Sequence, residues 1–229
     1  MKLGSLRPAD TSGRQDRSSL CVCSWNLAGV GEEDFCLLLD QISDNYSWDI
    51  LLLQEAFTRT EGISNESNHL VFTPSMTCGN LRCPAIVVHR RWAAPGVRVV
   101  AQGFRWLAIQ LWTDYVFVSL HLPHSGLGFE TFAGCLDEVD FFLSNFQSRF
   151  QILGMDANVA VHSITDHWHV GDFTLKIDQT GSYDQRALLF LEFLSTHNLF
   201  LTNTFGEKGA NGPATRRSWD EKTHSQIDL

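Results

Sequence analysis

Basic residues are scarce in this sequence. Its 229 residues include 17 Lys and Arg against 26 Asp and Glu, which gives a formal net charge of −9 at pH 7. Proteins that hold nucleic acid on a broad basic surface neutralise its phosphates with Lys and Arg, so the acidic balance argues against binding of that kind. A protein of this charge that acts on phosphates would need a divalent cation.

Cysteine pairs with the spacing of a metal or redox motif are also absent. None of the six cysteines forms a C-x-x-C pair, and most of them have apolar neighbours. The pattern favours reduced, packed thiols over a disulfide framework or a zinc site, and with them an intracellular protein, nuclear or cytoplasmic. His167 and His169 have a zinc-like spacing, but no other clear ligands accompany them.

Long apolar segments are missing as well. Residues 1–19 mix basic, acidic and serine residues without the apolar core of a signal peptide, and we expect a disordered leader there. No run approaches the length that spans a bilayer, so we expect no membrane partner. Residues 20–229 are long enough for one α/β domain, and 44% apolar residues with 16 Phe and 7 Trp supply a sizeable core.

Apolar periodicity predicts strands and helices in alternation. Strands are expected over residues 20–26, 49–55, 69–72, 85–89, 97–101, 104–112, 115–121, 150–158, 199–204 and 225–229. Helices are expected over residues 32–46, 129–150 and 183–197, the last opened by a capping box at Ser182–Gln185, and the polar stretches 58–83 and 160–181 are predicted to be mainly loops. Turn signals from 85 to 121 indicate an antiparallel meander, whereas residues 20–55 indicate a strand–helix–strand unit.

Polar residues follow several of these strands at the point where each strand ends. The stretch 150–158 delivers Asp156 and Asn158, a pattern that also suits an Asx-stabilised turn. Other predicted strands end on Asn26, Glu55, His121 and Asp228. Each has a plainer interpretation as well: a turn closed by Asn26, a cap formed by Glu55, or a packed or solvated His121.

If these strand ends converge, they assemble the groups that phosphodiester hydrolysis needs. Carboxylates hold a hard divalent cation, and Mg²⁺ prefers one or two of them together with phosphate oxygens. An Asp can orient and deprotonate the attacking water, an imidazole can transfer a proton, and amides can stabilise an oxyanion. The joint placement, rather than any single residue, predicts this chemistry.

Five motifs in a fixed order carry a resemblance to a known family. They are Ser24-Trp25-Asn26-Leu27-Ala28-Gly29, Leu53-Gln54-Glu55, Ser119-Leu120-His121-Leu122-Pro123, Gly154-Met155-Asp156-Ala157-Asn158 and Gln226-Ile227-Asp228. From about residue 20 to residue 229 the sequence resembles the endonuclease/exonuclease/phosphatase family. The resemblance implies an α/β (α+β) fold, deoxyribonuclease I-like, in which a four-layer sandwich of two packed mixed β-sheets is flanked by helices.

The same resemblance implies roles for these residues. Glu55 would hold an essential Mg²⁺, or Mn²⁺, with help from Asn26. Asp156 would orient the nucleophilic water, and Asn158 would contact the scissile phosphate. His121 matches a position at which deoxyribonuclease I-like members carry an acid/base histidine, so it would protonate the leaving oxygen.

A narrower resemblance concerns the C-terminal third of the sequence. Val170-Gly171-Asp172, Gly181 to Phe193, Asn203-Thr204-Phe205 and Arg216-Arg217-Ser218-Trp219 are similar to the endonuclease domains that precede reverse transcriptase in non-LTR retroelements. This similarity implies a DNA substrate. It would place Asn203, Arg216 and Arg217 near the nucleic acid, although both arginines could equally be ordinary solvated side chains.

Two departures from the family pattern affect the expected activity. Ala28 stands where some relatives carry an acidic residue. In the family the strand of Asp228 is followed by a Ser-Asp-His motif, whose Asp completes the metal site and whose His would pair with Asp228. The printed sequence ends at Leu229, so we expect a C-terminally truncated domain with weak or no activity.

Two further functions stay open at this point. One is a catalytically dead remnant that binds protein or nucleic acid without a divalent metal. The other, within the same superfamily, is a phosphatase or phosphodiesterase for inositol phosphates or lipids, since an acidic protein also suits a small anionic substrate carried in by metal.

Overall fold

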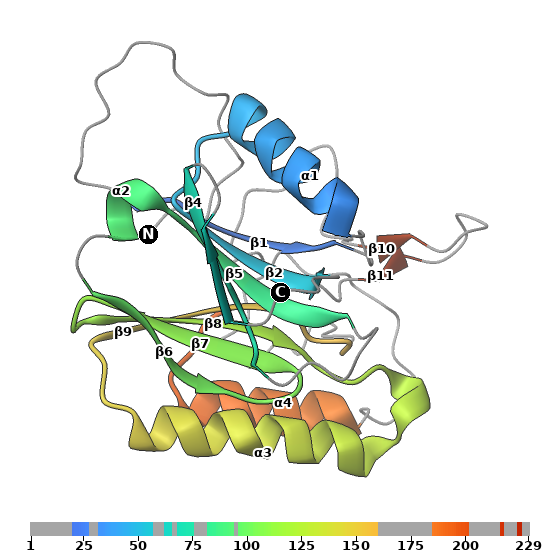
Figure 1. Cartoon of the computed structure of the whole chain (residues 1–229). Coiled ribbons are helices and arrows are strands. Elements are labelled where there is room, and N and C mark those ends of the chain that lie inside the picture. Colours follow the sequence, from blue (N-terminus) through green and yellow to red (C-terminus); the bar gives the residue numbers. More distant parts are fainter. Residues whose placement is uncertain are drawn as a thin grey trace. The chain divides into compact units, whose positions relative to one another are not determined.

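The computed structural model describes residues 20–27, 32–56, 62–65, 68–75, 82–93, 96–159, 185–201, 216–217 and 224–225 (Figure 1). The chain divides into two compact units. One comprises Met1–His121 with Ser148–Met155, and the other comprises Leu122–Gln147 with Asp156–Leu229. Among the described residues, no helix has the length and apolar character needed to cross a membrane.

The first unit contains a five-stranded sheet in the order β1-β2-β5-β4-β3. Its strands are β1 (Val22–Asn26), β2 (Ile50–Ala56), β3 (Gly62–Asn65), β4 (His69–Thr73) and β5 (Cys83–His89). β1 and β2 run parallel and are connected through α1 (Glu32–Asn45), whereas the other neighbours are antiparallel. The predicted strand–helix–strand unit is therefore confirmed.

The side chains of β2 alternate between two apolar cores, as the period of two in a strand requires. Leu51 and Leu53 face the core that α1 closes, and α1 lies alongside β1 and β2 in Figure 1. Ile50 and Leu52 face the opposite core. The α1 residues in the first core are Phe35, Leu39 and Ile42. Because both faces are covered, β2 is an almost continuous apolar run rather than an alternating one.

A second sheet of four strands, in the order β6-β7-β8-β9, covers the other face. Its strands are β6 (Val97–Gln102), β7 (Trp106–Leu111), β8 (Tyr115–His121) and β9 (Phe150–Asp156). Leu107, Ile109, Leu111 and Phe117 from this sheet pack into the same core as Ile50 and Leu52. The fold is thus a mixed α/β arrangement with two packed sheets and helices, and the expected fold class is confirmed.

The strand directions make the second sheet mixed as well. β6, β7 and β8 form consecutive antiparallel pairs, as the meander predicts. Two backbone hydrogen bonds flank β8 and β9: the Phe150 N–H donates to the Asp114 carbonyl, and the Leu122 N–H donates to the Asp156 carbonyl, each at 2.9 Å. Since both partners advance along the chain in the same sense, β9 runs parallel to β8 and both strands end at one edge.

In the second unit, the helices α3 (Phe129–Asn145) and α4 (Gln185–Thr196) pack against each other. A short 3₁₀ turn, Ser125–Leu127, precedes α3. Arg186, 5% exposed, joins α4 to that segment because its guanidinium donates to the carbonyls of Pro123 and Gly128. Two two-residue strands, β10 (Arg216–Arg217) and β11 (His224–Ser225), form an antiparallel pair.

The structure corrects two of the expected elements and adds two that were not expected. The run at 85–89 does not join the meander, because β5 pairs with β2 and β4 in the first sheet. A short helix, α2 (Arg90–Ala93), follows β5 and was not expected, and neither was β3. The long helix ends at Asn145 rather than 150, since Phe146 is already extended at φ −101° and ψ 105°. The capping box and the part of 199–204 beyond Leu201 lie outside the described residues.

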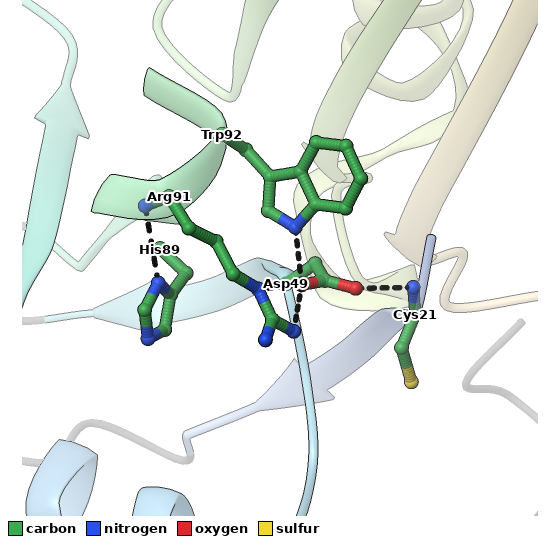
Figure 2. A network of polar contacts seen from close by, with 5 residues as sticks. All are labelled: Cys21, Asp49, His89, Arg91 and Trp92. Atoms are coloured by element: carbon green, nitrogen blue, oxygen red, sulfur yellow. Dashed lines mark hydrogen bonds and ion pairs between the residues drawn. The ribbon is translucent and has the colours of Figure 1, made fainter. Parts of the chain in front are cut away.

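The contacts of α2 explain why the chain changes sheets after β5. Figure 2 shows Asp49, which immediately precedes β2, surrounded by donors from elsewhere in the chain. The Arg91 guanidinium and the Trp92 indole N–H donate to its Oδ1, and the Cys21 amide donates to its Oδ2 at 2.7 Å. Asp49 is 1% exposed, so these donors offset the cost of burying its charge.

Candidate active site

Glu55 occupies a β-bulge near the end of β2. The pairing of β2 with β5 shifts register between Leu53 and Ala56, and Glu55 has a φ of 55°. Leu53 and Ala56 both face the α1 core, so an extra residue is accommodated between them. A non-glycine residue in this left-handed region stores about 1–3 kcal/mol of backbone strain, which persists where the surroundings fix it.

The Glu55 carboxylate contacts side chains from three other segments. Asn26, at the end of β1, donates its Nδ2 hydrogen to Oε1 at 3.5 Å. The Nε2 atom of His121, at the end of β8, lies 3.7 Å from the same oxygen. Arg82 pairs with Oε2. The side chains of Glu55 and His121 are 16% and 13% exposed, so the carboxylate is partly shielded from solvent but still accessible.

Asp156 and Asn158 form a tight turn at the end of β9. The Asn158 N–H donates to Asp156 Oδ1 at 3.1 Å, and Asn158 has a φ of 47°. The Asn158 side-chain amide donates to the Leu122 carbonyl at 2.9 Å. The Asx-stabilised turn considered from the sequence is therefore present. It fixes the backbone at the point where the strand delivers Asp156, a residue that is 4% exposed.

The ends of β8 and β9 bring His121 and Asp156 to the same edge. Leu122 directly follows His121, and its N–H donates to the backbone carbonyl of Asp156, the last residue of β9. Glu55, His121 and Asp156 each offer one ligand atom, and these atoms all lie within 4.8 Å of one another. Two carboxylate oxygens and an imidazole nitrogen are a donor set that suits a divalent cation, with the oxygens suited to Mg²⁺ or Mn²⁺.

The structure does not describe the side chains of the other predicted site residues. Asn203 and Asp228 lie outside the described residues. For Arg216 and Arg217 the structure describes only the backbone, as strand β10 paired with β11. Their expected roles toward nucleic acid and the terminal motif therefore stay predictions.

Two residues near Glu55 were not assigned roles from the sequence. Arg82 lies within a stretch predicted to be loop, where no spacing pattern marks a single cation. Gln54 belongs to a quoted motif, but it follows an apolar run on β2, and nothing local shows that its side chain meets three other strands. Both contacts join residues 27 or more positions apart, which explains why local patterns do not reveal them.

Comparisons with known proteins bear on the fold. No model of a protein family matches this chain, and no curated protein matches it. One similar solved structure is described as the endonuclease domain of TRAS1, a telomere-specific non-LTR retrotransposon, with 16% identity and a TM-score of 0.55 over 92% of this chain and 83% of that chain. A likeness at this identity shows the fold alone. Membership of the endonuclease/exonuclease/phosphatase family stays a prediction.

Proposed function

We propose that this chain is a nuclease-like phosphodiester hydrolase that uses a divalent cation, Mg²⁺ or Mn²⁺, and acts on DNA as a retroelement-type endonuclease domain. The observation that carries the proposal is the meeting of Glu55, His121 and Asp156 at strand ends. The likeness of the fold to a retrotransposon endonuclease domain supports the substrate class. The acidic composition agrees with a site that depends on a cation rather than on a basic surface.

Glu55 is the proposed principal ligand of the cation. Its Oε1 accepts a hydrogen bond from Asn26, so the amide holds the carboxylate in one orientation and can reach the same ion with its oxygen. The bulge and the left-handed backbone of Glu55 aim its side chain at this position. When bound, the cation would supply positive charge that polarises a phosphate oxygen and offsets charge developing in the transition state.

The remaining residues are proposed to move protons and to hold the phosphate. Asp156 orients the attacking water and takes its proton as the oxygen bonds to phosphorus. His121 gives a proton to the leaving oxygen as the bond from phosphorus to that oxygen breaks. Asn158 uses one amide hydrogen for the Leu122 carbonyl, and an amide carries a second hydrogen that can be donated to a phosphate oxygen.

Residues toward the C-terminus are proposed to contact the DNA. Arg216 and Arg217 would neutralise backbone phosphates, and Asn203 would lie beside the nucleic acid. Asp228 would pair with the histidine of a Ser-Asp-His motif where such a motif follows it. These four assignments rest on the sequence resemblance.

A plasmid-nicking assay tests the proposed function. Supercoiled plasmid incubated with Mg²⁺ should be converted to the open circle, weakly or not at all by the chain alone and faster when a Ser-Asp-His segment follows it, and excess chelator should stop the reaction. Glu55→Gln removes the ligand charge but keeps the shape, and we expect a loss of at least about a hundredfold in rate. Glu130→Gln, an exposed carboxylate in the first turn of α3, is the matched control and should nick like the wild type.

Three results would contradict the proposal. Nicking that survives Glu55→Gln would show that the activity belongs to another site or another protein. DNA binding without nicking, unaffected by chelator, would support a binding module instead. Release of phosphate from phosphomonoesters alone, with plasmid left intact, would support a phosphatase.

A further inference from the structure

Gln54 is a buried polar side chain between the two sheets. It precedes Glu55 on β2 and is 1% exposed. The alternation along β2 turns Gln54 toward the second sheet, on the face that carries Ile50 and Leu52. A primary amide in this position is costly unless its hydrogens and its oxygen find partners.

The amide of Gln54 finds partners on three other segments of sheet. Its Nε2 lies 3.2 Å from Ser119 Oγ on β8 and 3.1 Å from the Gly154 carbonyl on β9. The same atom lies 3.3 Å from Ser24 Oγ on β1 and 3.1 Å from the Leu52 carbonyl on β2 itself. The Ser24 hydroxyl also lies within 3.4 Å of Oε1 as a donor. One side chain thus bridges β1, β2, β8 and β9.

Each bridged position stands just before a proposed site residue. Ser24 is two residues before Asn26, Ser119 two before His121, and Gly154 two before Asp156, while Gln54 itself precedes Glu55. Residues two apart in a strand point to the same face. The hydrogen bonds of Gln54 therefore connect the strands two residues before the proposed site residues.

Close packing of the strands around Gln54 depends on Gly154. A Cβ atom built on Gly154 would meet Leu52 Cβ at 2.5 Å and Ser24 Oγ at 2.7 Å. No side chain larger than hydrogen fits there, so β9 can approach β1 and β2 only with glycine at this position. Ser119 strengthens the same junction, because its hydroxyl donates to the Leu53 carbonyl at 2.7 Å.

We propose that Gln54 is a positioning residue, which sets the spacing of Glu55, His121 and Asp156 through its bonds to β8 and β9 and thereby sets the affinity for the divalent cation. The inference rests on the proposed function, because it concerns the same site. It goes further by naming a residue that touches neither cation nor substrate. Partners that orient metal ligands from behind typically change affinity by about 10- to 100-fold when they are removed.

Gln54→Met is the test, with Gln110→Met as the matched control. Methionine keeps much of the length and volume of glutamine but removes the hydrogen-bonding groups. Gln110 on β7 is also buried, at 7% exposed, and its amide bonds Arg98 and the Thr113 carbonyl, well away from the strand ends. Both variants should lose stability, which thermal unfolding measures. A difference in cation affinity between them would therefore be an effect on the site and not on stability.

The decisive measurement is the Mn²⁺ affinity of the folded protein, by titration calorimetry at a temperature where circular dichroism shows each variant to be folded. Gln54→Met should weaken Mn²⁺ binding about tenfold or more, whereas Gln110→Met should bind like the wild type. In the nicking assay, raising the cation concentration should restore much of the rate of Gln54→Met. A Ser119→Ala variant, which removes one bridge partner, should weaken Mn²⁺ binding in the same direction.

The outcomes separate this inference from the function on which it rests. If the wild type binds no Mn²⁺, the proposed function fails first. If the wild type binds Mn²⁺ and Gln54→Met binds it equally well while folded, Gln54 is only a structural residue and the inference is overturned. Should Gln54→Met fail to fold, equal Mn²⁺ affinity in Ser119→Ala and the wild type would overturn it.

Discussion

Glu55 combines a strained backbone with different partners on its two carboxylate oxygens. Asn26 and His121 lie on one of its carboxylate oxygens and Arg82 on the other. Four non-glycine residues have positive φ in the described part of the chain, and Glu55 and Asn158 are two of them. Of the other two, Trp112 directly follows β7 and Asn198 lies two residues beyond the end of α4, where turns are expected. Strain at the two proposed site residues agrees with a fixed constellation.

Arg82 leads to a prediction about cation binding. Its guanidinium occupies one oxygen of Glu55 and competes there with any incoming cation, so Arg82→Gln should strengthen Mn²⁺ binding. Arg82 is 56% exposed, and exposed ion pairs contribute about 1 kcal/mol or less, which corresponds to about fivefold or less in affinity. Calorimetric titration measures the change, with Arg98→Gln as a control that should have no effect. Weaker Mn²⁺ binding in Arg82→Gln would mean that the arginine supports the site.

The sequence indicated three residues that the structure brings together, because polar residues that follow apolar strands can be recognised. Glu55, His121 and Asp156 could be found that way, because a break in an apolar run is visible in the sequence itself. Arg82 and Gln54 could not, because their roles depend on partners that only the packed sheets bring within reach. The strained backbone of Glu55 could not be predicted from the sequence either, since a bulge arises from the pairing of two strands.

At the scale of elements, buried polar groups anchor β2 at both ends. Asp49 at its start accepts hydrogen bonds from Cys21, Arg91 and Trp92 (Figure 2). Near its end, the Gln54 amide has partners on three other strands. The Asp49 contacts also tie α2 to the sheet and lead β5 out of the expected meander. Turn signals at Pro95 and Gly96 look the same for a hairpin and for a change of sheet, which is why the sequence could not separate them.

Beside that end of the sheet, a histidine pair on β4 and β5 predicts a dependence of stability on pH. His69 stacks on Trp48 with ring centroids 4.8 Å apart, and the His89 ring lies 5.5 Å from that of His69. Burial, and then the neighbouring His89, lowers the pKa of His69 below 6.5, although Asp40 acts in the opposite direction. Burial and then Arg91 lower the pKa of His89, opposed by Asp49.

The sign of the effect follows from where protons bind. Below about pH 6.5 both histidines bind protons in the unfolded chain, whereas in the folded chain their lowered pKa values oppose protonation. The stabilising contribution is therefore present above that pH and is lost as the pH falls through the lower pKa values of the folded chain. Urea unfolding between pH 8 and pH 5 should show a falling free energy of unfolding, and His69→Phe, which keeps the stacking on Trp48, should flatten the curve. An identical slope in wild type and variant would contradict this assignment.

At the scale of the whole molecule, the family resemblance implied the two-sheet fold, and the sequence pattern indicated most of its strands and helices but not how they bring the site residues together. The near-continuous apolar run of β2 and the regular strands from 97 to 121 mark sheets with buried faces, and the fold of the TRAS1 endonuclease domain agrees with that arrangement. The chemistry needs convergence of strand ends, which periodicity alone cannot demonstrate. The acidic composition agrees with the proposal that a cation, rather than a basic surface, would bring a phosphate substrate to the site.

Glu55 is proposed to hold one divalent cation, with the Asp156 carboxylate close enough to stabilise the charge of that cation. Titration of Mn²⁺ into the wild-type chain, Glu55→Gln and Asp156→Asn, followed by calorimetry at low ionic strength, tests it most directly. The wild type should show a single saturable site, and each variant should lose affinity on the order of tenfold or more, with both variants still folded by circular dichroism. Equal affinity in all three proteins, or no Mn²⁺ binding to the wild type, would contradict it.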